Sequence, residues 1–162
     1  EETGFPVLSA NLLDLTGTTG EIISPFIIKE IKGIKVAVMG LTVQILPPGS
    51  FWEKVFKFKF LDPVSTALEY IPILREKADL IIILSHVGKD GDMKIAGTVQ
   101  GIDLIIGGHS HTPMEKPLKT GETLIVQAGY HAKSFGSLKL RIKKSDDRCF
   151  LETFNFSLVP MS

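Results

Sequence analysis

The chain has 162 residues, of which 44% are hydrophobic and 22% are charged, a composition typical of one globular domain. Its 18 basic and 18 acidic residues leave no formal net charge, so neither a nucleic-acid polymer nor an anionic membrane surface is an expected partner. No apolar run approaches the roughly 18 residues of a membrane span. The single cysteine, Cys149, excludes an intrachain disulfide.

Apolar stretches bounded by turn residues predict strands in the first quarter of the chain. We expect strands at residues 5–13, 22–31 and 34–40, with a turn at 16–20. Pro25 places the second of these at a sheet edge or at a strand start, because proline cannot donate to a strand ladder. The third is almost continuously apolar, which is typical of a parallel sheet and indicates an α/β fold.

Residues 42–60 have no clear period and carry four aromatic side chains, Phe51, Trp52, Phe56 and Phe58. They are predicted to form a long surface excursion, and loops of this length are often functional. We nevertheless expect the four rings to cover the edge of the domain's own core.

The next segment has the signature of a helix. Asp62 is a suitable N-cap and Pro63 a suitable first-turn residue. Apolar residues then recur at helical spacing, namely Val64, Ala67, Leu68, Ile71 and Leu74. Pro72 lies inside this pattern and predicts a kink or a broken last turn. We expect this helix to pack on the sheet.

Two apolar strands with a short helix between them predict a βαβ unit. The strands are expected at residues 79–85 and 102–106. The helix is expected to be capped by Asp92 and to run to about Gln100. Because the strands of such a unit are parallel, their carboxyl ends would meet at one edge of the sheet, where ligands bind in open α/β sheets.

The remaining sequence predicts a loop and then antiparallel strands. The loop is expected at residues 113–121. Strands are expected at 123–128, 136–143 and 149–158, with a turn at 144–148. The predicted fold is therefore α/β, with parallel βαβ units followed by antiparallel strands.

Histidines follow both strands of the βαβ unit. The first strand leads directly into His86. The second leads into Gly107 and Gly108, and then into His109 and His111, which one residue separates. Glycine lets the backbone turn and approach a ligand closely, and neutral imidazole is a preferred ligand of zinc-like metals. The three histidines are therefore candidate metal ligands.

Two arrangements of these ligands are open. Three imidazoles could hold one zinc and leave a position for water, or His109 and His111 could serve two metals, because residues i and i+2 of an extended segment point to opposite sides. Asp90 and Asp92 could be ligands or could support ligands, but Asp92 is better explained as a helix cap. His131 follows a separate strand and is expected to have no metal role.

Five strings extend the pattern beyond the histidines. In chain order they are Leu8-Ser-Ala-Asn11, Val38-Met-Gly-Leu-Thr42, Leu84-Ser-His-Val-Gly88, Asp103-Leu-Ile-Ile-Gly-Gly-His-Ser-His-Thr112, and Gln127-Ala-Gly129 continuing to Lys133. Together they resemble the calcineurin-like metallophosphoesterases, from about Phe5 to Leu140. More narrowly, they resemble the branch of 5'-nucleotidases and 2',3'-cyclic-nucleotide phosphodiesterases.

The resemblance implies a four-layer αββα sandwich, two divalent metals such as zinc or manganese, and a nucleotide substrate. It assigns His86 and His109 to the second metal and His111 to the first. The family's other ligands lie in an Asp-x-His pair, a bridging aspartate and a Gly-Asn-His-Glu stretch, for which this chain offers no convincing match. The chain is thus expected to be the carboxyl-terminal half of a catalytic domain, without the family's nucleotide-binding domain, and no catalytic residue is assigned in it.

These implications predict part of a nucleotide phosphohydrolase that is silent or nearly so on its own. A half-domain exposes apolar surface, so the chain is expected to dimerise or associate. The resemblance also implies a periplasmic, secreted or cell-surface protein. The competing hypothesis is a non-catalytic module whose histidines bind one structural metal and whose role is interaction.

Overall fold

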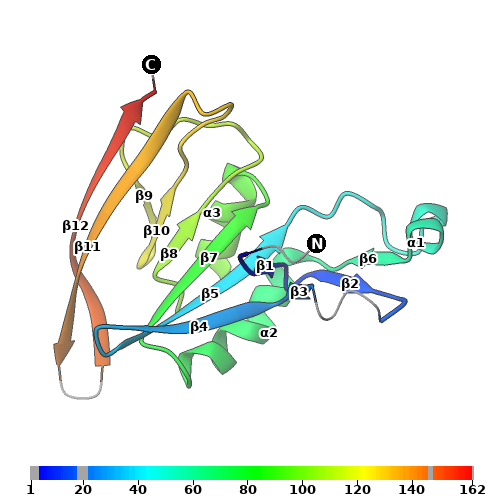
Figure 1. The fold of residues 1–162 in the computed structure, drawn as a ribbon, viewed down its shortest axis with the longest axis horizontal. Coiled ribbons are helices and arrows are strands. Elements are labelled where there is room, and N and C mark those ends of the chain that lie inside the picture. Colours follow the sequence, from blue (N-terminus) through cyan, green and yellow to red (C-terminus); the bar gives the residue numbers. More distant parts are fainter. Residues whose placement is uncertain (1–3, 18–21, 146–147, 162) are drawn as a thin grey trace.

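A six-stranded mixed sheet lies at the centre of the computed structural model, which describes residues 4–17, 22–145 and 148–161 (Figure 1). The strand order is β4-β5-β7-β8-β10-β9. The strands are β4 (Phe26–Ile31), β5 (Ile34–Thr42), β7 (Leu80–His86), β8 (Leu104–Ile106), β9 (Leu118–Thr120) and β10 (Thr123–Val126). The four inner strands are parallel, whereas β4 and β9 pair antiparallel at the edges. The predicted α/β class and its βαβ unit are confirmed.

Two helices, α2 (Pro63–Arg75) and α3 (Lys89–Thr98), cover one face of this sheet. Alternate strand residues meet them, because successive side chains of a strand point to opposite faces. The buried residues of this core include Ala37, Met39, Ala67, Ile71, Leu74, Ile81, Ile83, Ile95, Ile105 and Ile125. Each buried isoleucine or leucine contributes about 1.5–3 kcal/mol, so this core holds the parallel strands, and with them their carboxyl ends, in fixed positions.

Helix α2 begins as the sequence predicts. The Asp62 carboxylate accepts a hydrogen bond from the Ser65 backbone N–H at 2.8 Å, and Pro63 occupies the first helical position. This hydrogen bond lowers the pKa of Asp62. Of the two outcomes expected from Pro72, the broken last turn does not occur, because α2 continues past Pro72 to Arg75. Among the described residues no helix is long and apolar enough to cross a membrane.

An antiparallel hairpin packs on the opposite face of the sheet. Its strands are β11 (Ser134–Ser145) and β12 (Arg148–Pro160), so the predicted antiparallel pair is confirmed. Residues 146 and 147 of the predicted turn lie outside the described residues. The apolar contact joins Leu104, Leu124 and Val126 of the sheet to Leu138, Leu140, Leu151 and Phe156 of the hairpin. The hairpin therefore covers the β8–β10 side of this face.

The strand β10 differs from its predicted antiparallel role. It runs parallel to β8, and its antiparallel partner is β9, which lies in the segment predicted to be a loop. Parallel strands need a long connection. The stretch between β8 and β10 provides one, and it contains His109, His111 and β9. Three parallel strands therefore end near the histidines instead of two.

The predicted strand at residues 5–13 is broken by a buried asparagine. The observed strands are β1 (Val7–Leu8) and β2 (Leu12–Asp14). Asn11 is 0% exposed; its amide nitrogen donates to the carbonyls of Thr42 and Leu61 at 2.7 and 3.1 Å, and its amide oxygen accepts from the Thr42 N–H at 2.9 Å. The chain bends at Asn11, so that β1 and β2 pair with different strands, and these bonds hold Asn11 in place between them.

The predicted strand at residues 22–31 divides at Pro25. Its parts are β3 (Ile23–Ser24), which pairs parallel with β1, and β4, which begins one residue after Pro25 at the sheet edge. The edge position and the strand start expected from Pro25 are thus confirmed. Residues 18–20 of the predicted turn at 16–20 lie outside the described residues.

The excursion at residues 42–60 contains regular structure that the sequence did not predict. A short helix, α1 (Phe51–Phe56), is followed by β6 (Phe58–Phe60), which pairs with β2. Figure 1 shows α1 projecting from the sheet at the end of this ribbon. Phe51, Trp52 and Phe56 are 53–70% exposed, so the prediction that they cover the core edge is wrong. Trp52 instead stacks on Phe56 and meets Phe51 edge-on, and in each pair the ring centroids lie 5.6 Å apart.

Candidate functional site

The carboxyl ends of three adjacent parallel strands bring polar side chains together. His86 is the last residue of β7, His109 follows β8, and Gln127 follows β10. The ring centroids of His86 and His109 lie 5.1 Å apart at an interplanar angle of 68°, and both residues are exposed. The βαβ topology alone accounts for this meeting, because it places the ends of β7 and β8 side by side.

His111 lies in a different group of rings. It stacks on Tyr130 with centroids 5.0 Å apart and planes 14° apart, and the His131 ring centroid is 6.1 Å away. Within the part of the chain that the structure describes, no three His, Cys, Asp or Glu side chains are grouped to hold one ion. The three histidine side chains are therefore not grouped around one point in this arrangement. His86 and His109 form a pair, and His111 lies with Tyr130 and His131 instead.

The two glycines after β8 lie where a side chain would not fit. A Cβ atom added to Gly107 would lie 2.4 Å from the Asp92 carboxylate, and one added to Gly108 would lie 3.2 Å from His86 Nδ1. The glycines thus permit close approach to neighbouring protein groups. Neither glycine has a positive φ. The residues with left-handed backbone are His109, with φ of 66°, and His111, with φ of 55°, which the sequence did not predict.

Asp92 is not the helix cap that the sequence predicted. Gly88 occupies the N-cap position with φ of 96° and no side-chain cap, and Asp92 lies inside the first turn of α3, 0% exposed. The prediction failed because the helix begins at a glycine, which adopts this positive φ readily and offers no side chain that a sequence pattern could identify as a cap. Asp90, the other carboxylate considered as a ligand, is exposed in the same turn.

The buried Asp92 carboxylate supports the turn that follows His86. It accepts a hydrogen bond from the Ser85 hydroxyl, which in turn accepts from the Val87 N–H at 3.1 Å. Its second oxygen is buried with no hydrogen-bond partner among the described residues. Burial raises the pKa of Asp92 to about 6, and the bond from Ser85 opposes part of this rise.

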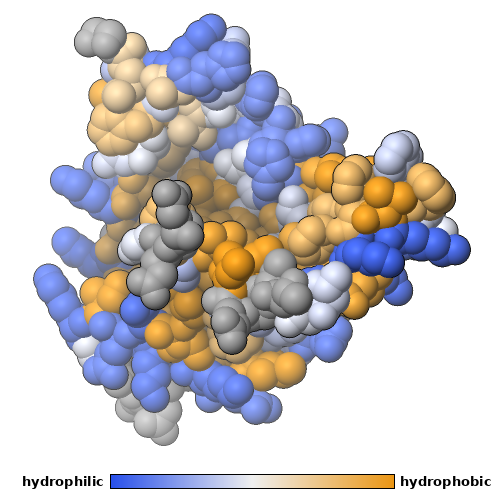
Figure 2. Space-filling view, turned by 45° about the vertical axis from the view of Figure 1, so that its right-hand side comes forward, coloured by the Kyte–Doolittle hydropathy of each residue, from blue (hydrophilic) through white to orange (hydrophobic). Residues whose placement is uncertain are grey.

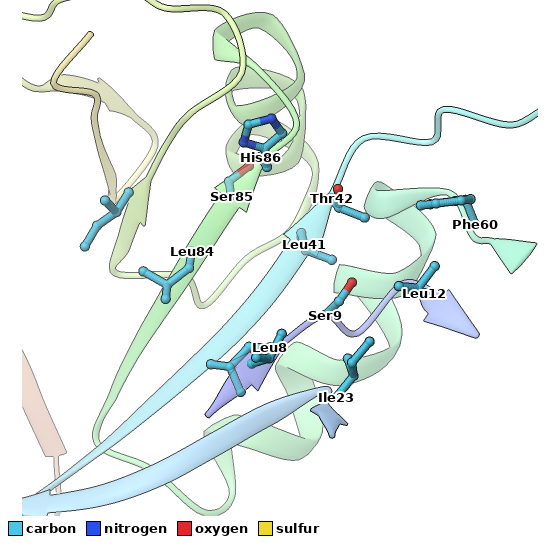
Figure 3. A pocket seen from close by; sticks show the side chains of 12 residues that line it. Leu8, Ser9, Leu12, Ile23, Leu41, Thr42, Phe60, Leu84, Ser85 and His86 are labelled. Carbon is cyan, nitrogen blue, oxygen red and sulfur yellow. The ribbon is translucent and has the colours of Figure 1, made fainter. Parts of the chain in front are cut away.

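A groove with mainly apolar walls runs beside His86. Figure 3 shows Leu84, Ser85 and His86 succeeding one another along the end of β7, with Leu8 and Ser9 on the other side. The groove measures about 410 Å³. The groove lies on the face of the sheet that the helices leave open. His86 is one of its lining residues and is exposed to solvent.

The two neighbouring histidines fit a divalent metal. Zinc-like ions lie about 2.0–2.1 Å from each ligating imidazole nitrogen, and a 5.1 Å separation of ring centroids is compatible with two rings that share one ion. Exposure leaves further coordination positions open to other ligands. His111 offers a third imidazole, whose ring Tyr130 covers on one side. Lys133 Nζ lies 3.2 Å from the Tyr130 hydroxyl and adds a positive charge nearby.

Comparison with known proteins relates the chain to phosphoesterases of nucleotides, although no family model matches it. It is 31% identical over 185 residues to a trifunctional nucleotide phosphoesterase of Bacillus subtilis (strain 168), covering 99% of this chain and 12% of the relative. It is 30% identical over 193 residues to a 5'-nucleotidase of Vibrio cholerae, covering 100% of this chain and 34% of the relative. The chain thus spans about a third or less of these curated relatives.

Solved structures give the same relationship for the fold. The 5'-nucleotidase precursor from Thermus thermophilus superimposes with a TM-score of 0.77 at 26% identity, covering 97% of this chain and 34% of that chain. A calcineurin-like phosphoesterase of Bacillus subtilis superimposes with a TM-score of 0.74 at 23% identity, covering 98% of this chain and 56% of that chain.

Proposed function

Because the chain belongs in sequence and fold with the 5'-nucleotidases and related calcineurin-like phosphoesterases, we propose that it carries part of the metal site of a nucleotide phosphohydrolase. The observation that supports this most is the pair of exposed imidazoles, His86 and His109, 5.1 Å apart at the carboxyl ends of adjacent parallel strands. The substrate in this proposal is a 5'-nucleotide or a 2',3'-cyclic nucleotide, and the protein is exported from the cytoplasm, as the resemblance implies.

Each histidine has its own part in the proposed site. His86 and His109 would hold one divalent ion, such as zinc or manganese, and His111 would contribute to a second. Ions in such a site supply Lewis acidity and neutralise charge on phosphate oxygens. The role of the chain itself is to present the imidazoles in fixed places, and the packed strand ends and the Ser85–Asp92 hydrogen bond favour this.

The 162 residues alone are proposed to have little or no activity. A two-metal site needs a bridging carboxylate and further oxygen ligands, and Asp92, whose carboxylate supports the turn after His86, is fully buried and bonded to Ser85. Hydrolysis of a nucleoside 5'-monophosphate and of a 2',3'-cyclic nucleotide with Mn²⁺ is expected to stay at the level of the buffer. A metal-dependent turnover that His109→Ala abolishes would contradict this.

Calorimetric titration with Zn²⁺ tests the metal role of the histidines. His86→Ala and His109→Ala are each expected to weaken the tightest binding event at least tenfold, because each removes one of two ligands from the same ion. His131→Ala is the matched control, since His131 is also exposed and also has a left-handed backbone, with φ of 53°. Equal affinity in all of these variants would contradict the proposed site.

A further inference from the structure

Gln127 is a buried polar residue whose side chain, among the described residues, bonds only to the segment that carries His109 and His111. It is 1% exposed and follows the last residue of β10. Its amide nitrogen donates to the Gly108 carbonyl at 2.7 Å. Its amide oxygen accepts from the Ser110 hydroxyl at 3.0 Å and from the Thr112 backbone N–H. The residues before, between and after the two histidines are therefore held by one side chain.

The held segment has a conformation that its own residues do not favour. The Ser110 N–H donates to the Gly108 carbonyl at 2.8 Å, which makes a three-residue turn with His109 at its centre and φ of 66°. Turns of this kind with positive φ are rare and strained, and His111 is also left-handed. Non-glycine residues remain in such conformations only where the surroundings over-determine them.

The same network reaches the loop that follows His86. The Ser110 hydroxyl, which donates to Gln127, also accepts from the Lys89 N–H at 3.0 Å at the start of α3. The position of the His109 segment is thus tied to both neighbouring strand ends, since Gln127 extends from β10 and Lys89 follows the turn after β7.

We propose that Gln127 is a positioning residue for the metal site, which holds His109 and His111 in the left-handed conformation that presents their imidazoles to divalent metal. This inference rests on the proposed metal role of the histidines. Partners that orient metal ligands from behind change metal affinity about 10–100-fold when they are removed. Methionine in place of Gln127 keeps the length of the side chain and removes all three hydrogen bonds.

The experiment is a Zn²⁺ titration of the full chain, followed by long-range ¹H–¹⁵N spectra of its four histidine rings. Gln127→Met is expected to weaken zinc binding at His109 and His111 by about 10–100-fold and to shift both ring signals before zinc is added. Ser110→Ala, which removes one of the three bonds and the link to Lys89, is expected to show a smaller change of the same kind. It also carries the test if Gln127→Met does not fold.

Thr123→Val is the control for a merely structural effect. Thr123 is 3% exposed at the start of β10, the strand that Gln127 follows, and its hydroxyl donates to the Ile102 carbonyl at 2.8 Å, away from the histidines. This variant loses a buried hydrogen bond, as Gln127→Met does, and is expected to bind zinc within twofold of the wild type. Weakening in Gln127→Met and not in Thr123→Val supports the inference.

Two outcomes overturn it, and they are distinguishable. Wild-type histidine signals that respond to zinc, together with unchanged affinity and ring signals in a folded Gln127→Met, would overturn the positioning role and leave the proposed function standing. Wild-type histidine signals that do not respond to zinc at all would overturn the proposed metal role and the inference with it.

Discussion

Asp92 shows how a single buried carboxyl group links the packing of α3 to the turn after His86. The residue is 0% exposed, and burial raises its pKa from an ordinary value of 3.8 to about 6. The folded protein therefore holds a proton between about pH 4 and pH 6 that the unfolded chain has already released. The free energy of unfolding must fall as pH rises through this window, by roughly 3 kcal/mol in total.

Chemical denaturation from pH 4 to pH 8, with EDTA present, measures this dependence. Asp92→Asn removes the titrating group, so we expect the fall between pH 4 and pH 6 to be absent or much smaller in this variant. Asp62→Asn is the matched control. The pKa of Asp62 is lowered, so that group contributes stability at higher pH that is lost only as pH falls below about 4. Identical profiles for the wild type and Asp92→Asn would contradict the assigned pKa.

The sequence predicted some residues of the proposed site and missed others for a physical reason. His86 follows a predicted strand directly, and His109 and His111 come within five residues of another, so the strand pattern alone was sufficient to place them near the carboxyl ends of these strands. Gln127 was missed because its importance depends on bonds to residues 15–19 positions away. Its sequence signals are the string Gln127-Ala-Gly129, which the resemblance includes without giving Gln127 a role, and the place of a polar amide directly after the apolar strand β10.

At the scale of elements, α1 is an aromatic helix that contributes little to the core. The Trp52 ring contacts those of Phe51 and Phe56, and all three residues remain more than half exposed. The helix is only six residues long, and it stands at the end of the β2–β6 ribbon. Truncation of such a side chain removes little buried area, unlike truncation in the core of the sheet.

Trp52→Ala is therefore expected to lower the free energy of unfolding by less than about 1 kcal/mol, as for other surface substitutions. Ile105→Ala is the comparison, because Ile105 is 0% exposed beneath the helices. It is expected to cost about 2–5 kcal/mol. Urea denaturation monitored by circular dichroism measures both, and a loss for Trp52→Ala as large as that for Ile105→Ala would show that α1 packs on the core.

Long elements with a clear period were predictable from the sequence, and short or non-local ones were not. Helix α2 has an N-cap, a first-turn proline and helical apolar spacing, and β5 and β7 are apolar runs, so each appears where it was predicted. The strands β6 and β9 have three residues each, too few to show a period. The parallel pairing of β10 with β8 depends on the path of the intervening chain.

At the scale of the whole molecule, the two faces of the sheet differ in how far they are covered. The helices close one face, and the hairpin covers the β8–β10 side of the other. Leu84 and Ile106 point to the remaining part of that face and are 42% and 41% exposed. Figure 2 shows apolar side chains gathered on this side of the molecule.

This open apolar face is expected to make the chain associate with itself at high concentration, because exposed apolar patches favour association. Leu84→Glu should weaken association about 10–100-fold, the effect of losing about 1.5–3 kcal/mol of leucine burial. Leu68→Glu is the matched control, since Leu68 is 49% exposed on α2, which covers the other face. Light scattering that finds a monomer at every concentration would contradict this prediction.

The most direct measurement of the proposed site is an anomalous difference map from crystals of this chain soaked in Zn²⁺ or Mn²⁺. The assignment of His86 and His109 to one ion predicts a peak about 2.0–2.1 Å from one nitrogen of each ring for zinc. The same soak of His109→Ala crystals should lose this peak. Peaks at other positions, with none between His86 and His109, would contradict the assignment of these histidines as ligands of one metal.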